Sequence, residues 1–298
     1  MGSARSLTKN TKGINIFRSD LRAGIALYSL AMLIFVVMDS FAKGLVGTQH
    51  IVQVVWLRFA FHFVTLCVLV PQKRTIAMRF RTRSFKWHAA RGLCLTLMTF
   101  LFYTGLRYVP LAEANILAST APFVVAILAV ALLGEHIGAF RWAMICAGFV
   151  GALIVIRPGL GFLHWGAVFP LLTAVCFAIV QLVSRRLARD ENAWTTLLYS
   201  AGLGTVVVTP LGLAFWESPG VGTLTLMASV GVAAAAGDTM LLRSIKLAPA
   251  STVAPFQYTQ IVWAILIGYI WFGELTDFVG IIGASIIVAS GLALMRHT

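Results

Sequence analysis

The sequence predicts an all-α integral membrane protein whose ten transmembrane helices form two inverted five-helix repeats around a central cavity. The first observation behind this prediction is composition: 59% of the 298 residues are hydrophobic, only 11% are charged, and the mean hydropathy is +0.91. A soluble domain carries roughly 25% charged residues, so this chain lacks the polar surface that water requires. The second observation is that apolar runs of about 20 residues, each able to span a bilayer as a helix, recur along the chain.

The repeat is clearest in a stretch of about fifty residues that occurs twice. Superimposing Pro110 on Pro249 aligns the two copies without a gap. Each copy has a basic residue, a proline, a long apolar run, a Gly-Glu pair and a second apolar run that ends at arginine. The alignment pairs Arg107 with Lys246, Thr120 with Thr259, Gly134-Glu135 with Gly273-Glu274, and Arg157 with Arg296. Ungapped spacing over this length indicates a duplicated helical hairpin.

The first half is predicted to hold a polar cytoplasmic tail, residues 1–21, and a five-helix repeat, residues 22–157. The first apolar run is too long for the core of a signal peptide and lacks a cleavage site of small residues, so it is interpreted as a helix. A basic segment at about 72–91 follows the second span. The five spans cover about residues 23–41, 52–70, 88–106, 111–133 and 139–156.

The second five-helix repeat is predicted over residues 158–298, with spans at about 165–184, 193–215, 221–242, 250–272 and 277–295. The first spans of the two halves also match, because Gly24 falls on Gly166 and Lys43 on Arg185. Five is an odd number, so the second copy must cross the membrane in the opposite sense to the first. Secondary transporters use such inverted repeats and place the substrate between them, near the bilayer midplane.

Basic residues predict the orientation of the chain. Nineteen of the 23 Lys and Arg residues fall on one side of the predicted topology. Lys43, Arg107 and Arg157 fall on the other side, and Arg58 lies within a span. Because cytoplasmic loops collect basic residues, we expect both termini in the cytoplasm. The net charge of +13 is explained by these loops, so no nucleic-acid partner is expected.

Two features of the apolar runs concern packing. The cysteines are interpreted as small buried hydrophobic residues rather than disulfide partners or metal ligands. They are Cys67, Cys94, Cys146 and Cys176. Small residues four apart on the fifth span, Ala143, Ala147 and Gly151, are expected to let another helix approach closely.

The arrangement resembles the drug/metabolite transporter superfamily, and within it the EamA-type ten-helix exporters of bacteria. The resemblance rests on two five-helix repeats, each ending in a hairpin with proline near its start and Leu-Gly-Glu or Phe-Gly-Glu at its turn. The nearest likeness is to the aromatic amino-acid exporters. The recurrent positions are Pro110, Gly134, Glu135, Pro249, Gly273 and Glu274, and all are interpreted as structural. The resemblance implies export of amino acids, including aromatic ones, and related metabolites across the bacterial inner membrane.

Several function classes are weighed against this expectation. The chain contains no His-Glu-x-x-His, Gly-x-Ser-x-Gly or Walker motif, so neither an enzyme nor an ATP-driven pump is expected, and no cofactor or metal. Facilitated diffusion and ion-coupled transport both stay open. The alternatives are an uptake or exchange carrier for another small metabolite, an intramembrane enzyme using His62, Glu113 and Asp238 on a lipid, and a structural membrane subunit. Both a monomer and a homodimer fit the sequence.

The substrate site is predicted from polar and aromatic residues inside the spans, because ionisable groups in hydrocarbon tend to face partners or water. The six candidates are Phe102, Tyr103, Glu113, Asp238, Gln260 and Trp263. The rings would offer apolar area and cation–π attraction to an ammonium. The amide would orient the substrate, and a carboxylate would meet the ammonium or carry a proton. The alternative is that tryptophan and tyrosine near span ends form interfacial belts.

Other polar residues have plainer interpretations. Asp39 and Lys43 are four residues apart on one face of the first span, so we expect that they can pair with each other. Arg58 and His62 repeat that spacing on the second span. Near span ends such groups commonly extend toward the interface or close gaps between helices. Glu135 and Glu274 are interpreted as polar residues of hairpin turns.

Overall fold

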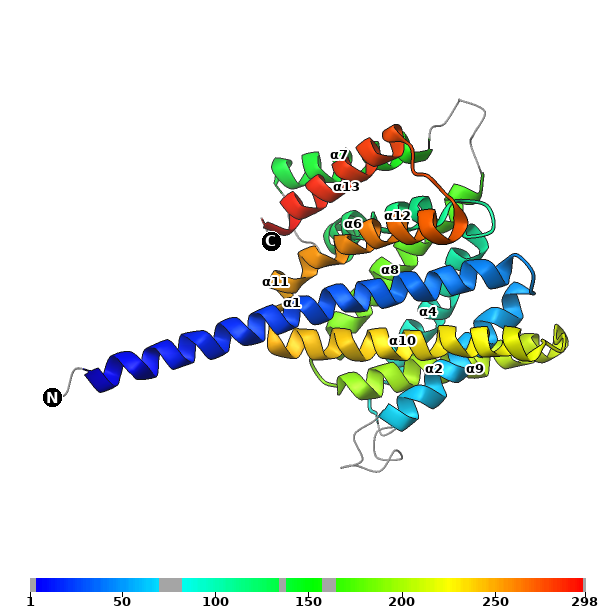
Figure 1. The fold of residues 1–298 in the computed structure, drawn as a ribbon, viewed down its shortest axis with the longest axis horizontal. Coiled ribbons are helices and arrows are strands. Elements are labelled where there is room, and N and C mark those ends of the chain that lie inside the picture. Colours follow the sequence, from blue (N-terminus) through cyan, green and yellow to red (C-terminus); the bar gives the residue numbers. More distant parts are fainter. Residues whose placement is uncertain (1–3, 70–81, 134–137, 157–164, 297–298) are drawn as a thin grey trace.

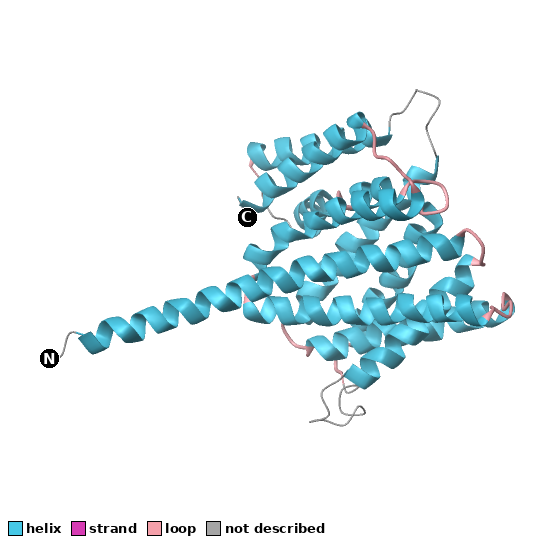
Figure 2. Cartoon of the chain, in the orientation of Figure 1, coloured by secondary structure: helices cyan, strands magenta, loops and turns pink. Residues whose placement is uncertain are grey.

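The computed structural model describes residues 4–69, 82–133, 138–156 and 165–296. Regular secondary structure within these ranges is entirely helical (Figure 2). The predicted Gly134-Glu135 turn, Arg157 and residues 70–81 of the basic segment lie outside the described residues.

The first half of the chain forms helices that follow the apolar runs. Helix α1 is longer than the predicted span because its backbone is helical through the polar tail, and it projects beyond the other helices in Figure 1. Extending an existing helix costs far less than nucleating a new one. The helices are α1 (Ala4–Val46), α2 (Ile51–Leu69), α4 (Phe85–Gly105), α5 (Leu111–Ala118), α6 (Ala121–Leu133) and α7 (Ala139–Ile156).

The second half contains further helices and two short 3-10 segments. Eight spans within the described ranges are long and apolar enough to cross a membrane. The predicted third span corresponds to α4, which has 21 residues and includes Lys86 and Arg91. The predicted ninth span corresponds to α11, η2 and α12, the last of which has 14 residues. The elements are η1 (Trp165–Ala167), α8 (Val168–Leu187), α9 (Ala193–Ala214), α10 (Val221–Leu247), α11 (Ala250–Val253), η2 (Ala254–Tyr258), α12 (Thr259–Phe272) and α13 (Phe278–Arg296).

Two of the predicted spans are interrupted rather than continuous. The fourth breaks between α5 and α6, and the ninth breaks between α11, η2 and α12. Pro122 has no N–H to donate to the carbonyl of Ala118, the last residue of α5, and Pro255 interrupts the second segment in the same way. Thr120 directly precedes α6, and Thr259, its partner in the repeat, begins α12.

The helices pack in pairs that join the two halves. The most extensive contacts are α1 with α10, α7 with α13, α4 with α8, and α2 with both α9 and α10. The first two pairs lie side by side in Figure 1. Between α7 and α13, a Cβ added to Gly151 would lie 2.9 Å from the carbonyl oxygen of Gly283. The expected close packing at Gly151 is therefore confirmed, because only glycine lets the two backbones approach so closely.

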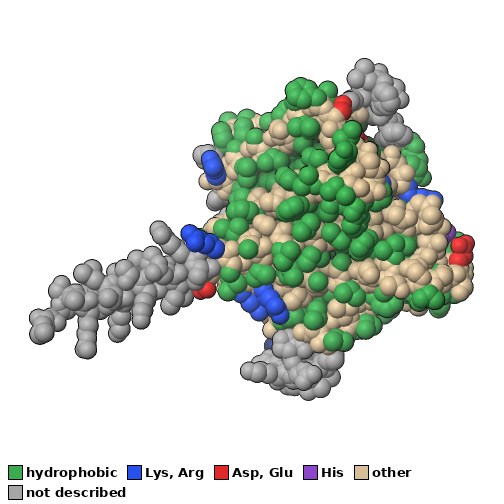
Figure 3. All heavy atoms as spheres, viewed as in Figure 1, with side chains coloured by type: hydrophobic (Ala, Val, Ile, Leu, Met, Phe, Trp, Pro, Cys, Tyr) green, Lys and Arg blue, Asp and Glu red, His purple; other side chains and the backbone are tan. Residues whose placement is uncertain are grey.

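The surface of the bundle is apolar. Hydrophobic side chains cover the face seen in Figure 3, and Lys and Arg gather toward the ends of the helices. Large apolar residues such as Val68, Leu213 and Ile270 are exposed, as expected where lipid rather than water surrounds the helices. The predicted burial of the cysteines is wrong for Cys146, which is exposed on α7. An apolar side chain gains nothing by avoiding lipid, so helix packing alone decides such burial.

Candidate functional site

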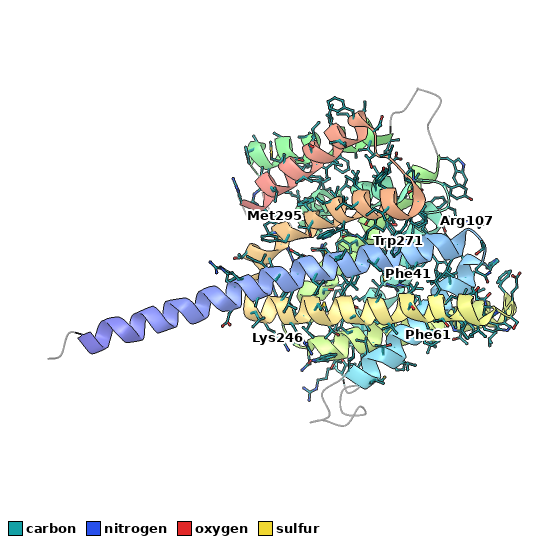
Figure 4. The ribbon with its side chains drawn as sticks, in the orientation of Figure 1. Phe41, Phe61, Arg107, Lys246, Trp271 and Met295 are labelled. Atoms are coloured by element: carbon teal, nitrogen blue, oxygen red, sulfur yellow. The ribbon has the colours of Figure 1, made fainter. Side chains whose placement is uncertain are left out.

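A cavity of about 500 Å³ opens at the end of the bundle opposite the two chain termini. We call this the distal end, and Figure 4 labels Arg107 there. The walls combine charged side chains of both signs with apolar ones. The charged residues are Lys43, Arg107, Glu113 and Glu274, and the apolar residues include Leu117, Val155, Ile156 and Ala167.

The charged residues arrive from separate parts of the chain. Lys43 lies in the last turn of α1, and Glu113 lies in the first turn of α5. Arg107 belongs to the connection between α4 and α5. Gly273 ends α12 with φ of +66°, a left-handed conformation that costs glycine little, and thereby turns the chain so that Glu274 faces the cavity. In the second copy of the Gly-Glu pair, Gly273 therefore has a structural role and Glu274 lines the cavity.

Glu274 connects three segments at the cavity wall. One carboxylate oxygen pairs with Lys43 Nζ, and the other accepts the N–H of Leu111 at 2.9 Å. This N–H belongs to the first residue of α5, where helix geometry leaves the donor without an intrahelical partner. Lys43 Nζ also donates to the carbonyl oxygen of Val109 at 3.2 Å. The ion pair between Lys43 and Glu274 therefore joins α1 to the connection before α5 and to the turn after α12.

Aromatic contacts support this junction. Phe41 stacks on Trp271 with ring centroids 5.4 Å apart, and Figure 4 shows the two rings between α1 and α12. Lys43 Nζ lies 5.3 Å from the centroid of Phe272. The predicted pairing of Lys43 with Asp39 is wrong. Lys43 instead reaches across to Glu274, which sequence spacing along one helix cannot show.

A second polar layer lies one helical turn deeper. Asp39 precedes Lys43 by four residues on α1, and Tyr103 precedes the cavity residue Leu106 by three residues. Both interact electrostatically with Arg58 of α2. All three side chains are buried: Asp39 is 4% exposed, Tyr103 is 1% exposed and Arg58 is 7% exposed. Asp39 therefore faces a cation across the bundle and not the lysine on its own helix.

A third layer follows on α2 and α10. His62 lies one turn beyond Arg58, and its Nε2 is 3.2 Å from Oδ2 of Asp238. Arg91 also acts electrostatically on Asp238. Its Nε donates to Ser184 Oγ at 2.8 Å, and its Nη1 donates to Ser200 Oγ. Charged residues thus follow one another from the distal cavity toward the end that holds the termini.

The structure does not gather the six predicted site residues in one cavity. Glu113 lines the distal cavity. Phe102 and Tyr103 are buried in the core, and Asp238 faces His62. The other two lie on α12. Gln260 Nε2 donates to Asn115 Oδ1 at 2.6 Å, whereas Trp263 packs against the core and its Nε1 meets no hydrogen-bond partner among the described residues.

Sequence reasoning missed several residues of these layers as site residues. The sequence favours structural roles for Lys43, Arg58 and Glu274, and nothing in it distinguishes Asn115. The repeated Gly-Glu pair was a usable signal for Glu274, because a hairpin turn does not require glutamate. Among the described residues, no three His, Cys, Asp or Glu side chains cluster in a way that could hold a metal ion.

An apolar helical bundle with interrupted helices, internal charges and a polar cavity defines a polytopic membrane protein of the solute-transporting class. The chain belongs to the EamA-like transporter family, which it matches over residues 22–157 and again over residues 164–296. This family is part of the drug/metabolite transporter superfamily. The superfamily assignment expected from the sequence is confirmed.

Curated relatives are similar over most of their length. An S-adenosylmethionine uptake transporter of Rickettsia prowazekii is 26% identical over 272 residues, covering 91% of this chain and 92% of that protein. A riboflavin transporter of Rhizobium johnstonii is 29% identical over 242 residues, covering 80% and 79%. A pseudopaline exporter of Pseudomonas aeruginosa is 27% identical over 281 residues, covering 93% and 97%.

A solved crystal structure has the same fold. It covers 93% of this chain and 98% of its own length with a TM-score of 0.65 at 16% sequence identity. This likeness concerns the fold, and the family match alone assigns the chain to the drug/metabolite superfamily.

Proposed function

We propose that the protein is a secondary transporter of small amphoteric metabolites that carry an amino-acid group. The observation that carries this proposal is the charge pattern of the distal cavity, which has two basic and two acidic side chains beside an apolar wall. The basic side chains suit a carboxylate, the acidic ones suit an ammonium, and the wall suits a bulky side chain. The cavity volume, about 500 Å³, lies within the range of small-molecule sites.

The S-adenosylmethionine relative supports the substrate class, whereas the riboflavin relative does not carry it, and the relatives do not agree on one direction of transport. One is named for uptake of S-adenosylmethionine, an amino acid joined to an adenosyl group, and another is named as an exporter. Export of amino acids, including aromatic ones, is the direction that the sequence resemblance implies. Uptake of a larger amino-acid derivative is the second candidate, favoured by the uptake relatives.

Three observations support an inverted repeat as the basis of alternating access. The same family is matched twice along the chain. The pairing of α1 with α10 has its counterpart in the pairing of α8 with α4, which is what a twofold relation between halves requires. The breaks at Thr120 and Thr259 occupy equivalent positions. In such transporters, interrupted helices meet near the midplane, where the substrate binds.

Transport in both directions tests the proposed function. Purified full-length protein in liposomes would be loaded with unlabelled phenylalanine, methionine or S-adenosylmethionine, and counterflow of the labelled compound would be recorded. We expect counterflow of at least one amino-acid-bearing solute, and none of a sugar such as glucose. Efflux from overproducing cells then distinguishes export from uptake. Absence of counterflow for every amino-acid-bearing solute would reject this substrate class.

A further inference from the structure

We propose that Asp39, Arg58 and Tyr103 form the site that holds the charged headgroup of the substrate below the distal cavity. Arg58 and Tyr103 would bind the carboxylate, and Asp39 would bind the ammonium. This inference rests on the proposed function, because it names the residues that recognise an amphoteric substrate.

The first observation is the burial of charge without local compensation. Asp39 is 4% exposed and Arg58 is 7% exposed. A buried charge is costly unless it is paired and hydrogen-bonded. Among the described residues, the ion pairs that the structure contains do not include Arg58. Asp39 and Arg58 interact electrostatically, yet no ion pair joins them among the described residues.

The second observation is that buried hydrogen-bond donors of Arg58 and Tyr103 have no partner in the described part of the chain. Nε and Nη1 of Arg58 have no hydrogen-bond partner among the described residues, and neither does the hydroxyl of Tyr103. The hydroxyl lies beside Arg58 without meeting hydrogen-bond geometry. Buried donors are normally satisfied, so an unpaired group requires an explanation. A planar carboxylate with two acceptor oxygens matches the guanidinium fork.

The third observation is position along the path. Asp39 lies one helical turn below Lys43, and Tyr103 lies one turn below the cavity residue Leu106, a depth of roughly 5–6 Å in each case. The cavity above has charges of both signs, and so does this layer. A substrate moving inward from the cavity therefore leaves one pair of opposite charges and meets another.

The combination of charges selects for an amphoteric headgroup. A simple anion beside Arg58 is repelled by Asp39, and a simple cation beside Asp39 is repelled by Arg58. A headgroup with both charges satisfies the two side chains at once. The guanidinium of Arg58 also lies over the ring of Phe59, with Cζ 4.8 Å from the ring centroid.

Substrate selectivity tests this site more directly than activity does. Counterflow would be measured in proteoliposomes for the transported amino acid and for its decarboxylated amine, with the parent, Arg58→Gln and Arg58→Lys. The parent should favour the amino acid. Arg58→Gln should weaken apparent affinity for the amino acid by about tenfold or more and leave the amine nearly unchanged. Arg58→Lys keeps the charge but loses the guanidinium fork, so its apparent affinity for the amino acid should lie between those of the parent and Arg58→Gln.

Two further variants keep the test decisive. Arg186→Gln is the matched control, because Arg186 is exposed on α8 and pairs with Asp190 at the other end of the bundle; selectivity should stay parental. If Arg58→Gln fails to fold, Asp39→Asn combined with Arg58→Gln removes both buried charges and should restore membrane insertion. The double variant should still lose discrimination between amino acid and amine.

The outcomes separate the site from the proposed function. Parental selectivity in Arg58→Gln or in the double variant would overturn the site while leaving the transporter of amino-acid-bearing solutes in place. Inhibition of the parent by inorganic phosphate as strongly as by the amino acid would also overturn it, because Asp39 would then have no role. Failure of the parent to transport any amino-acid-bearing solute would reject the proposed function, and the site with it.

Discussion

At the residue scale, Glu274 shows how one side chain acquires two tasks. Its carboxylate accepts the first N–H of α5 and also pairs with Lys43 of α1. Lys43 is 12% exposed and Glu274 is 23% exposed, so water screens the pair only partly. The charge and the helix end stabilise each other, because the N-terminus of a helix favours an anion.

Replacing Glu274 by Gln tests both tasks. The amide keeps an acceptor for Leu111 but loses the charge that pairs with Lys43, so we expect a stability loss of about 1–3 kcal/mol. Thermal unfolding of the detergent-solubilised protein measures it. Glu217→Gln is the control, because Glu217 is also exposed at the distal end and forms no ion pair among the described residues. Equal melting temperatures for Glu274→Gln and Glu217→Gln would show that Glu274 does not stabilise the contact between α1 and α5.

The contact between Gln260 and Asn115 joins the two interrupted spans. Gln260→Ala, Asn115→Ala and the double variant form a double-mutant cycle in the same unfolding assay. Each single variant already loses the hydrogen bond, so the double variant should lose less stability than the two single losses added together. We expect this difference, the coupling energy, to be about 0.5–1.5 kcal/mol. Strictly additive effects would show that the amides do not interact in the folded protein.

At the element scale, the breaks in the fourth and ninth predicted spans are the main departure from the sequence expectation. Both follow from proline inside an otherwise helical run, where the ring removes a hydrogen bond and clashes with the preceding turn. Proline alone does not decide the outcome, because Pro210 lies inside the continuous helix α9. Neighbouring helices and hydroxyl side chains determine whether the freed carbonyl is accommodated.

Pro122→Ala tests whether the break is needed for transport. Alanine restores the missing N–H and favours a continuous helix, so the melting temperature should rise while the counterflow rate falls severalfold. Pro210→Ala is the matched control within an unbroken helix, and its transport rate should stay parental. A parental rate in Pro122→Ala would show that transport does not depend on the break between α5 and α6.

At the scale of the whole molecule, polar side chains form successive layers from the distal cavity inward. Glu113 and Glu274 lie in the first layer, Asp39 and Arg58 in the second, and Asp238 in the third. Large apolar side chains are exposed around these layers, and Lys and Arg gather toward the ends of the helices. A polar route through an apolar bundle is the feature that a solute carrier needs.

The distribution of Lys and Arg predicts the orientation of the molecule in the membrane. In a variant without the four native cysteines, His136→Cys and Thr276→Cys would be labelled in intact cells with a membrane-impermeant thiol reagent. The inverted repeat and cytoplasmic termini predict labelling at position 276 alone. Labelling of both cysteines without permeabilising the cells would contradict the inverted arrangement.

The sequence by itself determined the membrane class, the approximate helix positions and the family resemblance. Hydropathy and a long ungapped repeat are properties of the chain, so residues such as Pro110 and Pro249 reveal them without coordinates. Glu113 was also identified as a candidate, because an ionisable residue inside an apolar run is conspicuous on its own.

Only the tertiary structure decided which charges meet. Sequence spacing paired Asp39 with Lys43, whereas the fold turns Asp39 toward Arg58 and Lys43 toward Glu274. Position along a helix fixes which side chains share a face, but packing between helices decides which partner a side chain meets. Asp39 meets a residue of the next helix, whereas Lys43 meets a residue 231 positions further along the chain. The free energy of a charge in an apolar interior depends on its partners across those helices, and the chain order does not contain them.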